Sequence, residues 1–584
     1  MNAYRPNPAE TTFLLFDVLR LPQQLAELPA LAEVADPALM QQVLEEAGKF
    51  VGEVVAPLNR DGDEIGCRFE AGTVTAPPGF ADAYRAFWQA GWPALATATE
   101  DGGQGLPSVL EAVLYEWLSA ANHGWTMAPG LLHGAYECVK HHASDALKAQ
   151  YLEKLATGEW LATMCLTEPH AGSDLGLVRT KAVPQPDGGY LLSGTKIFIS
   201  GGEHDLSENI VHLVLARLPD APAGPKGLSL FLVPKFYTDG SGHSAGPSQA
   251  RPAPSGGSAP HEVGSVGAWV RSAVVCERIE EKMGLHGSPT CVMRFDEAHA
   301  QIVGEPGRGL NAMFVMMNAA RLHVALQGVG LLDAAWQKAN AYAAERRQMR
   351  APGPRVDGEA ADLIHRHPAM RQKLDTQRAW VDAGRVLAYR TALELDVAKH
   401  HPDAARRASA QRWCALTTPV LKSAFTEQAF SGGSECLQVF GGHGYVREWG
   451  IEQIVRDARV SMIYEGTNEI QAIDLLLRKV LPDGGTALNQ LLDELGEGLR
   501  ISALRDMAQT VVKAAPSSET LAHEVAGDFL RATALVLLDW AWQQIENAAP
   551  TDDERWQRPA LALHQRVLPE FEMRRQMVLA RCAQ

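Results

Sequence analysis

The chain has 584 residues, too many for one hydrophobic core, so three or four domains are expected. Its 46% hydrophobic and 21% charged content is typical of a soluble globular protein. A formal net charge of −16 and a pI near 5.6 argue against non-specific binding to nucleic acid or anionic membranes, although they are compatible with a local basic pocket for a phosphorylated ligand.

The cysteine pattern and the N-terminal sequence indicate a cytoplasmic protein. The 8 cysteines are scattered and form no C-x-x-C pair, which in a chain of this length favours reduced thiols over a disulfide framework. The first residues, MNAYRPNPAETTFLLFDVLRLPQQ, lack a charged segment followed by a long apolar core, so a secretion signal is not expected. No apolar run approaches the length that spans a bilayer, so we predict no integral membrane segment.

Residues 1–160 are predicted to form an N-terminal helical domain. Apolar residues recur at helical spacing in four segments of this region: Met40–Val55, Phe80–Trp92, Val109–Ala121 and Ala146–Leu155. The glycine-rich run from Asp101 to Pro107 predicts a loop between the second and third of them.

Residues 161–306 are predicted to form a middle β domain. Short segments rich in apolar and β-branched residues alternate there with glycine and proline turns: Tyr190–Ser200, Ile210–Arg217, Leu228–Val233 and Cys291–Phe295. Within this domain, residues from about 238 to 264 are a low-complexity Gly/Ser/Pro insertion that cannot pack a core.

Helices return in residues 307–482, the third predicted domain. A long helical segment begins at Gly309, and we expect it to be broken only at Gly328 and Gly330. Further helices are predicted over Pro368–Lys399, Ala404–Ser431 and Glu469–Val480. After a proline- and glycine-rich linker, residues 483–584 are predicted to form an additional helical domain.

The stretch from Gln438 to Gln471 carries the strongest chemical signal. It contains a glycine-rich turn and then a single carboxylate, Glu465, which follows the apolar run Val460–Ile463. A carboxylate among apolar residues has a raised pKa and can act as a base near neutral pH, and Gly466 lets backbone N–H groups approach a bound carbonyl or phosphate. The alternative is a plain helix start with Thr467 as its N-cap, which leaves the upstream glycines unexplained.

Three other segments could contact a ligand, and each has an ordinary structural alternative. The loop Cys165–Asp174 offers hydroxyls and backbone amides to a polar ring edge or a phosphate, or it is a surface turn. Phe198 and Ser200 share one face of a strand, which would let an aromatic ring and a hydroxyl meet one ligand, or they belong to an ordinary strand. The pair Arg346-Arg347 either favours the helix dipole or holds a pyrophosphate.

Two motif matches and the histidine pairs are rejected. Gly242–Gly246 fits the G-x-S-x-G pattern of hydrolases but lies in the low-complexity insertion. Gly307–Ala312 mimics a dinucleotide fingerprint without a βαβ unit around it. The histidine pairs lack partners at metal-ligand spacing, so no metal site is predicted.

The chain from roughly Asp17 to Val480 resembles the acyl-CoA dehydrogenase family. The resemblance rests on eight motifs in the family's order: CLTEPHAGSD, GTKIFIS, EKMGLHGSP, AARLHVALQGVG, ERRQ, QVFGGHGY, RDAR and YEGT. It implies an α+β multidomain fold with an N-terminal helical domain, a middle β-barrel-like domain and a C-terminal four-helix bundle, here followed by an extra C-terminal helical domain. The long architecture, the phrase ISGGEHDL and this extension are most similar to the 3-methylmercaptopropionyl-CoA dehydrogenase-like branch.

The resemblance also implies residue roles. Glu465 matches the catalytic base, and Ser173, Arg321 and Gly466 match substrate contacts. Contacts with FAD are implied for Met164, Leu166, Thr167, Gly172, Ser173, Phe198, Ile199, Ser200, Arg346, Gln348, Gln438, Gly441, Gly442, Thr467 and Glu469. In relatives the Arg346, Gln348 and Gln438–Gly442 contacts come from a neighbouring subunit.

The implied activity is FAD-dependent α,β-dehydrogenation of an acyl-CoA thioester to a trans-2-enoyl-CoA, with hydride transfer to flavin N5. The substrate would be 3-methylmercaptopropionyl-CoA or a short- to long-chain acyl-CoA, and an electron-transferring flavoprotein would accept the electrons. A homo-oligomer is expected, and a dimer is favoured because the extension would cover a surface used elsewhere for tetramer assembly.

Three alternatives remain at this point. An oxygen-using oxidase has the same fold and is poorly separated by sequence. A nucleic-acid-binding member is disfavoured, because residues 485–584 hold 10 Lys/Arg against 14 Asp/Glu. A non-catalytic flavoprotein is disfavoured by the intact YEGT motif.

Overall fold

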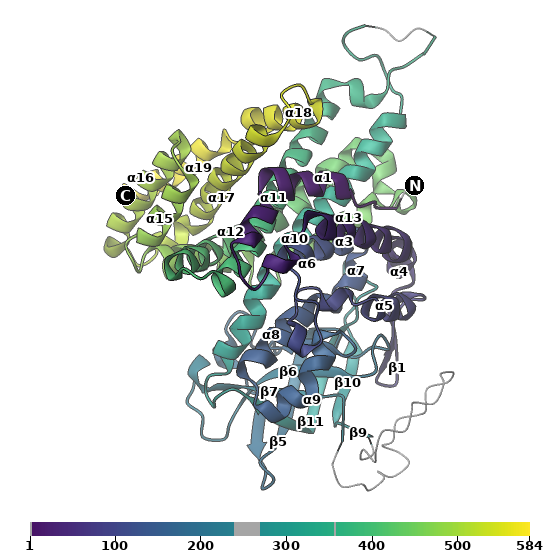
Figure 1. The fold of residues 1–584 in the computed structure, drawn as a ribbon, viewed down its shortest axis with the longest axis vertical. Helices are drawn as coiled ribbons and strands as arrows, with labels where there is room; N and C mark the ends of the chain where they lie inside the picture. The colour runs from purple at the N-terminus through teal and green to yellow at the C-terminus, as the bar shows by residue number, and fades with distance from the viewer. Residues whose placement is uncertain (1–2, 239–268, 355–357) are drawn as a thin grey trace.

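The computed structural model describes residues 3–238, 269–354 and 358–584. The β domain lies at one end of the molecule, the long helices run through the centre, and the C-terminal helices pack along one side of the centre (Figure 1). In these three described segments, no helix combines the length and apolarity that a membrane span requires.

Short helices build the N-terminal region, and the four predicted segments are helical. They are α1 (Pro8–Phe13), α2 (Leu21–Ala26), α3 (Pro37–Phe50), α4 (Asn59–Ile65), α5 (Phe80–Gln89), α6 (Ser108–Ala121), α7 (His123–Thr126), α8 (Leu132–His142) and α9 (Asp145–Ala156). The Asp36 side chain caps α3 by accepting from the Ala38 amide, and Pro37 occupies the first turn, where its missing N–H costs nothing. Helix α6 is buried along nearly its whole length, which places it at the centre of the domain.

The middle domain is a sheet of seven strands among the described residues. They are β3 (Leu161–Cys165), β4 (Lys181–Pro184), β5 (Tyr190–Ser200), β6 (Ile210–Arg217), β7 (Leu228–Pro234), β10 (Val274–Ile279) and β11 (Thr290–Val303). The order is β10-β11-β5-β4-β6-β3, and β7 pairs with both β11 and β6. Because β7 joins these two strands, the sheet closes on itself, which confirms the barrel-like prediction. Two hairpins stand apart: β1 (Arg68–Glu70) with β2 (Thr73–Thr75), and β8 (Phe236–Thr238) with β9 (Trp269–Arg271).

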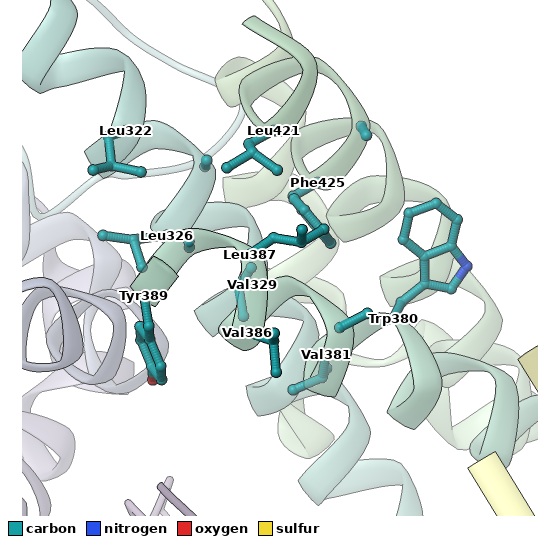
Figure 2. Packing of buried hydrophobic residues seen from close by; sticks show 14 of the residues in the cluster. Leu322, Leu326, Val329, Trp380, Val381, Val386, Leu387, Tyr389, Leu421 and Phe425 are labelled. Carbon is teal, nitrogen blue, oxygen red and sulfur yellow. The ribbon is translucent and has the colours of Figure 1, made fainter. Parts of the chain in front are cut away.

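Three long helices form the core of the third domain: α10 (Gly309–Glu345), α11 (Pro368–His400) and α12 (Ala404–Val439). The short helices α13 (Ile451–Arg459) and α14 (Asn468–Ile473) complete it, and α14 continues as a π-helical turn to Val480. Figure 2 shows how apolar side chains from α10, α11 and α12 interlock at their common interface. The predicted helix end at Ser431 was too early, because α12 continues to Val439.

The predicted break in α10 at Gly328 and Gly330 is wrong, since the helix is continuous. A Cβ at Gly328 would lie 2.7 Å from the Phe425 backbone of α12, and a Cβ at Gly330 would lie 2.4 Å from the Glu116 carbonyl oxygen of α6. These glycines therefore permit close helix packing from both sides, and this packing offsets the cost of about 1 kcal/mol per glycine inside a helix.

The C-terminal extension consists of α15 (Thr486–Leu495), α16 (Leu499–Ala514), α17 (Leu521–Ala548), α18 (Glu554–Ala562) and α19 (Glu570–Cys582). It packs on α11, α12 and α14, so it is part of the same hydrophobic core. The Trp542 indole of α17 is fully buried and donates to the Ala379 carbonyl of α11 over 2.8 Å.

A partly buried network of charges fastens the extension to the first helix of the chain. Arg555 of α18 donates to both carboxylate oxygens of Glu10 of α1, at 2.8 and 3.1 Å. The same guanidinium donates to Asp382 of α11, which is fully buried, at 2.8 and 3.0 Å. Arg378 pairs with the same two carboxylates. The two ends of the chain are thus joined through α11.

Candidate active site

Glu465 lies on a tight turn between the short 3₁₀ helix Val460–Met462 and α14. Glu465 and Gly466 both adopt left-handed backbone conformations, with φ of 55° and 84°. For a residue with a side chain this costs roughly 1–2 kcal/mol, and such strain persists only where the surroundings impose it. The buried Gln471 amide imposes it in part, because it donates to the Glu465 carbonyl over 3.0 Å.

The environment of the Glu465 carboxyl suits a base. Burial raises the pKa of Glu465 to about 7, against the opposing effect of Arg321 from α10 and Lys422 from α12. The residue keeps partial solvent access, so a ligand can reach it. A carboxyl with a pKa near 7 is ionised in a large fraction of molecules at neutral pH and still holds a proton strongly once it has taken one.

The residues around Glu465 are fixed from several elements. The Tyr464 hydroxyl donates to Gln327 of α10 over 2.6 Å. The Arg321 side chain is only 9% exposed, and its Nε has no hydrogen-bond partner among the described residues. Thr467 is the predicted N-cap of α14 and accepts from the Ile470 amide, while Glu469 is exposed beside it. Arg321 is therefore a buried cation with hydrogen-bonding capacity left for a ligand oxygen.

A second group of predicted residues lies in the β domain. Strand β3 carries Met164 and leads into the loop with Leu166 and Thr167, all partly buried, followed by exposed Gly172 and Ser173. The Ile197 amide of β5 donates to the Thr167 carbonyl over 2.9 Å, so this loop lies beside the Phe198–Ser200 segment. The position next to Gly172 is open, since an added Cβ would meet nothing within 4 Å.

Phe198 is turned outward by an irregularity in β5. The pairing with β11 shifts between Cys291 and Met293, and Phe198 has a φ of 59°. Its ring is 61% exposed while Ile199 is buried, and Ser200 is partly exposed. A bulge that re-aims an aromatic side chain into open space, at the cost of a strained backbone, is typical of a ligand-binding position.

Two buried charges that hold this loop were missed as site residues. Lys196 of β5 is fully buried and donates to the Leu166 carbonyl over 3.0 Å and to Glu168 over 2.9 Å. The Glu168 carboxylate also accepts from the amides of Arg179 and Thr180. A lysine within an apolar strand, beside a glutamate in the preceding loop, was the signal in the sequence, because such charges are rarely buried unless paired.

The β-domain group and the Glu465 turn meet at α7 and the residues that follow it. A Cβ at Gly201, directly after Ser200, would lie 3.6 Å from the Ala128 side chain. The neighbouring Met127 sulfur is 3.9 Å from the Tyr464 hydroxyl. Ala128 and Met127 therefore link the Phe198–Ser200 segment, and the loop that lies beside it, to the turn that carries Glu465.

The remaining predicted cofactor residues form a separate group at the far end of α10. Arg346 and Gln348 follow this helix, and Gln438 lies in the last turn of α12, shortly before Gly441 and Gly442. All five are exposed, and an added Cβ at either glycine would meet nothing within 4 Å. The two segments are joined by a 2.9 Å hydrogen bond between Tyr342 and His443.

This separate group is far from Glu465. Twenty-five residues of continuous helix divide Arg346 from Arg321, which at 1.5 Å per residue is about 37 Å. Within one chain, the group at Arg346 is therefore remote from the residues that surround Glu465.

One of the two rejected motifs lies within the described residues. Gly242–Gly246 lies outside the described residues. Gly307–Ala312 runs directly into α10 from β11, without a parallel strand to complete a βαβ unit among the strands described here. In the three described segments, no group of three or more His, Cys, Asp or Glu side chains is arranged to hold a metal ion.

Comparison with known families accounts for this arrangement. Three family models match the chain in order: the acyl-CoA dehydrogenase N-terminal domain over residues 39–159, the middle domain over 163–258 and the C-terminal domain over 307–480. The chain belongs to the acyl-CoA dehydrogenase family. It is therefore an oxidoreductase that carries out FAD-dependent acyl-CoA dehydrogenation.

Two curated relatives and one solved structure illustrate the similarity. The chain is 46% identical over 444 residues to 3-methylmercaptopropionyl-CoA dehydrogenase of Ruegeria pomeroyi, covering 76% of this chain and 71% of the relative. It is 33% identical over 510 residues to the broad-specificity linear acyl-CoA dehydrogenase FadE5 of Mycobacterium tuberculosis, covering 85% and 78%. The fold matches an acyl-CoA dehydrogenase of Bacillus anthracis, solved with FAD, at a TM-score of 0.71 and 22% identity, covering 93% of this chain and 88% of that one.

The residues present fit an FAD molecule. The open space beside Gly172, the outward Phe198 ring and the exposed Ser173 hydroxyl provide room, an apolar surface and a polar donor. Exposed guanidinium and backbone amide groups at Arg346, Gly441 and Gly442 suit phosphates.

Proposed function

We propose that Glu465 is the catalytic base, which removes the α-proton of an acyl-CoA thioester. The observation that carries this proposal is a strained, partly accessible turn that presents a carboxyl with a pKa of about 7 between two cations. The thioester carbonyl must be polarised as negative charge develops, and the backbone N–H of Glu465 is available for this. Arg321 and Gly466 would line the thioester and CoA side of the site, together with Ser173.

FAD, when bound, supplies the hydride acceptor at flavin N5, and the product is a trans-2-enoyl-CoA. The chain's own contribution is to hold the base, the substrate Cα–Cβ bond and the flavin in line and to keep water away. We assign the flavin and its pyrophosphate to residues from the first two groups: Met164, Leu166, Thr167, Gly172, Ser173, Phe198, Ile199, Ser200, Thr467 and Glu469.

Replacement of Lys196 by methionine is expected to lower FAD occupancy by about tenfold. The loss of the buried ammonium leaves Glu168 without its charge partner and releases the loop at Leu166. Lys181→Met on β4 is the matched control, because Lys181 is exposed. The measurement is the flavin content of purified protein, followed by FAD titration of the apoprotein. Equal affinity in the two variants would show that the pair does not support the flavin loop.

We propose that Arg346, Gln348, Gln438, Gly441 and Gly442 contact the FAD of a second copy of the chain. The separation of about 37 Å along α10 supports this division, because an FAD molecule placed at Glu465 cannot also reach Arg346 in the same chain. The exposed apolar side chains of Tyr445 and Met349, 88% and 78% accessible, lie beside this group and support an interface there.

A homodimer is therefore the proposed assembly. Sedimentation equilibrium should give about twice the chain mass of 63.2 kDa. A monomer that binds FAD with full affinity would contradict the assignment of these five residues to a partner site, and a tetramer would contradict the expectation that the extension limits assembly to two copies.

The proposed substrate is 3-methylmercaptopropionyl-CoA, because the relative with that activity is 46% identical. Short- to long-chain acyl-CoA thioesters are the second candidate, since a broad-specificity linear acyl-CoA dehydrogenase is 33% identical over more of the chain. In that case the enzyme would serve fatty acid β-oxidation. We place it in the cytoplasm, with an electron-transferring flavoprotein as acceptor.

A panel of acyl-CoA thioesters, scored by anaerobic flavin bleaching, tests the substrate assignment. We expect the fastest bleaching with 3-methylmercaptopropionyl-CoA, and faster bleaching with a linear acyl-CoA would favour the second candidate. Reoxidation of the bleached enzyme by electron-transferring flavoprotein is expected to be much faster than by oxygen. The reverse order would identify an oxidase.

A further inference from the structure

Lys422 is a buried cation that is not among the site residues predicted from the sequence. It lies in the middle of α12, and its side chain is fully buried. The ammonium donates to the Gly466 carbonyl over 2.8 Å and to the Asn468 side-chain oxygen over 3.1 Å. Both acceptors are neutral, so the positive charge is not neutralised by the groups that it hydrogen-bonds. Burying an ammonium in this way is costly and calls for a functional reason.

We infer that Lys422 is a positioning residue for Glu465, which fixes the turn that carries the carboxyl and supplies one of the two positive charges that face it. This inference rests on the proposed role of Glu465 as the base. Lys422 itself has no role in proton or hydride transfer.

The hydrogen-bond acceptors of Lys422 belong to the turn that carries Glu465 and to the start of α14. Gly466 has a left-handed backbone, and its carbonyl accepts from Lys422 and, over 3.3 Å, from Gln471. Asn468, the next acceptor of Lys422, also accepts from Thr426 and donates to the Ser423 carbonyl. One turn of α12 therefore fastens the chain directly after Glu465, at Gly466 and Asn468. Without it, the strained backbone of Glu465 would relax toward right-handed conformations.

The charged groups around the Glu465 carboxyl come from several helices. Arg321 faces Glu465 from α10, and Lys422 faces it from α12. Glu469 of α14 favours the charged form of Lys422, and Arg459 of α13 favours the ionised form of Glu469. Asp457 of α13 favours the neutral form of Tyr464, which precedes Glu465. A nearby cation favours the ionised carboxylate, so removal of Lys422 raises the pKa of Glu465 and leaves Arg321 as the remaining cation beside it.

The test compares Lys422→Met with Gln471→Leu in the FAD-loaded enzyme. Both variants remove a donor to the Gly466 carbonyl, but only the first removes a charge. The titration of Glu465 is followed in the absence of substrate by the infrared band of its protonated carboxyl, identified as the band that Glu465→Gln lacks. We expect Lys422→Met to raise the titration midpoint by about one pH unit. Gln471→Leu should leave the midpoint unchanged.

Single-turnover flavin bleaching provides the second readout. Both variants should slow bleaching, by about tenfold or more, because both loosen the turn. Only in Lys422→Met should the pH profile of bleaching also move to higher pH, since the base is then protonated up to a higher pH. Lys422→Gln keeps a neutral donor at this position and should show the pH shift with a smaller loss of rate.

An unchanged midpoint in Lys422→Met, or in Lys422→Gln if the methionine variant does not fold, would overturn the inference. This result is distinguishable from failure of the proposed function. If Glu465→Gln bleached as fast as the wild type, the assignment of the base would fail. If Glu465→Gln were inactive and the Lys422 variants titrated like the wild type, only the role of Lys422 would fail.

Discussion

Glu465→Gln is expected to retain FAD and to lose flavin bleaching by acyl-CoA, with a rate reduced by about 10³-fold or more. A positioned general base contributes roughly 10²–10⁴-fold, and the loss of the base also leaves the two cations beside the site unbalanced. Glutamine preserves the shape of the side chain, so the turn and the FAD site should survive. The measurement is anaerobic stopped-flow bleaching with saturating acyl-CoA.

The matched control for this variant is Glu427→Gln, which neutralises an exposed carboxylate on α12. It should bleach at the wild-type rate. The pH dependence of the wild type gives an independent check: the folded-state pKa of Glu465 is about 7, so bleaching should rise as the pH increases through about 7. A profile that is flat from pH 6 to pH 8 (about one unit either side of this value) would contradict Glu465 as the base.

Arg555→Met is expected to destabilise the protein by about 2–3 kcal/mol, the range for losing hydrogen bonds to charged groups. The change removes one of the two guanidinium groups that bridge Glu10 and the fully buried Asp382, and it leaves Arg378 as the remaining cation between them. The cost is large because part of the negative charge on two carboxylates, one of them in the interior, is no longer compensated. The midpoint of thermal unfolding should fall by several degrees, with the extension and the first helix losing protection from hydrogen exchange together.

Arg505→Met on α16 is the control, because its ion pair with Asp493 is exposed and should contribute at most about 1 kcal/mol. Acid titration adds a second test. Burial alone would raise the pKa of Glu10, but hydrogen bonding to Arg555 and the nearby Arg378 outweigh it and lower the pKa to about 2. A depressed carboxyl pKa contributes stability above the unfolded value of 4.5 that is lost as the pH falls toward 2. Equal thermal midpoints for Arg555→Met and wild type would contradict the network's role.

Much of the fold was predictable because local patterns and tertiary packing agree. The β-domain strands Tyr190–Ser200 and Ile210–Arg217 have the predicted bounds, since apolar and β-branched runs between glycine turns favour strands wherever they can be buried. The failure at Gly328 and Gly330 has the opposite cause. Helix propensity predicts a break there, but close contact with α6 and α12 stabilises the helix more than the glycines weaken it.

The candidate site was predictable only in part. Glu465 could be proposed from its apolar approach and the glycine after it, but its left-handed backbone and the charges that face it depend on tertiary structure. Lys422 precedes the Glu465 turn by about forty residues in the chain, and nothing in its local helical pattern distinguishes it from a surface lysine. Arg555 and Glu10 lie at opposite ends of the chain, so no local pattern could pair them.

The most direct test of the central claim uses an acyl-CoA that carries deuterium at the α-carbon, mixed anaerobically with the FAD-loaded wild-type enzyme. The account predicts that bleaching is slower than with the protiated substrate and that trans-2-enoyl-CoA appears in step with bleaching. Glu465→Gln is expected to show neither bleaching nor enoyl-CoA formation. Bleaching with full enoyl-CoA formation by Glu465→Gln at the wild-type rate would contradict the account.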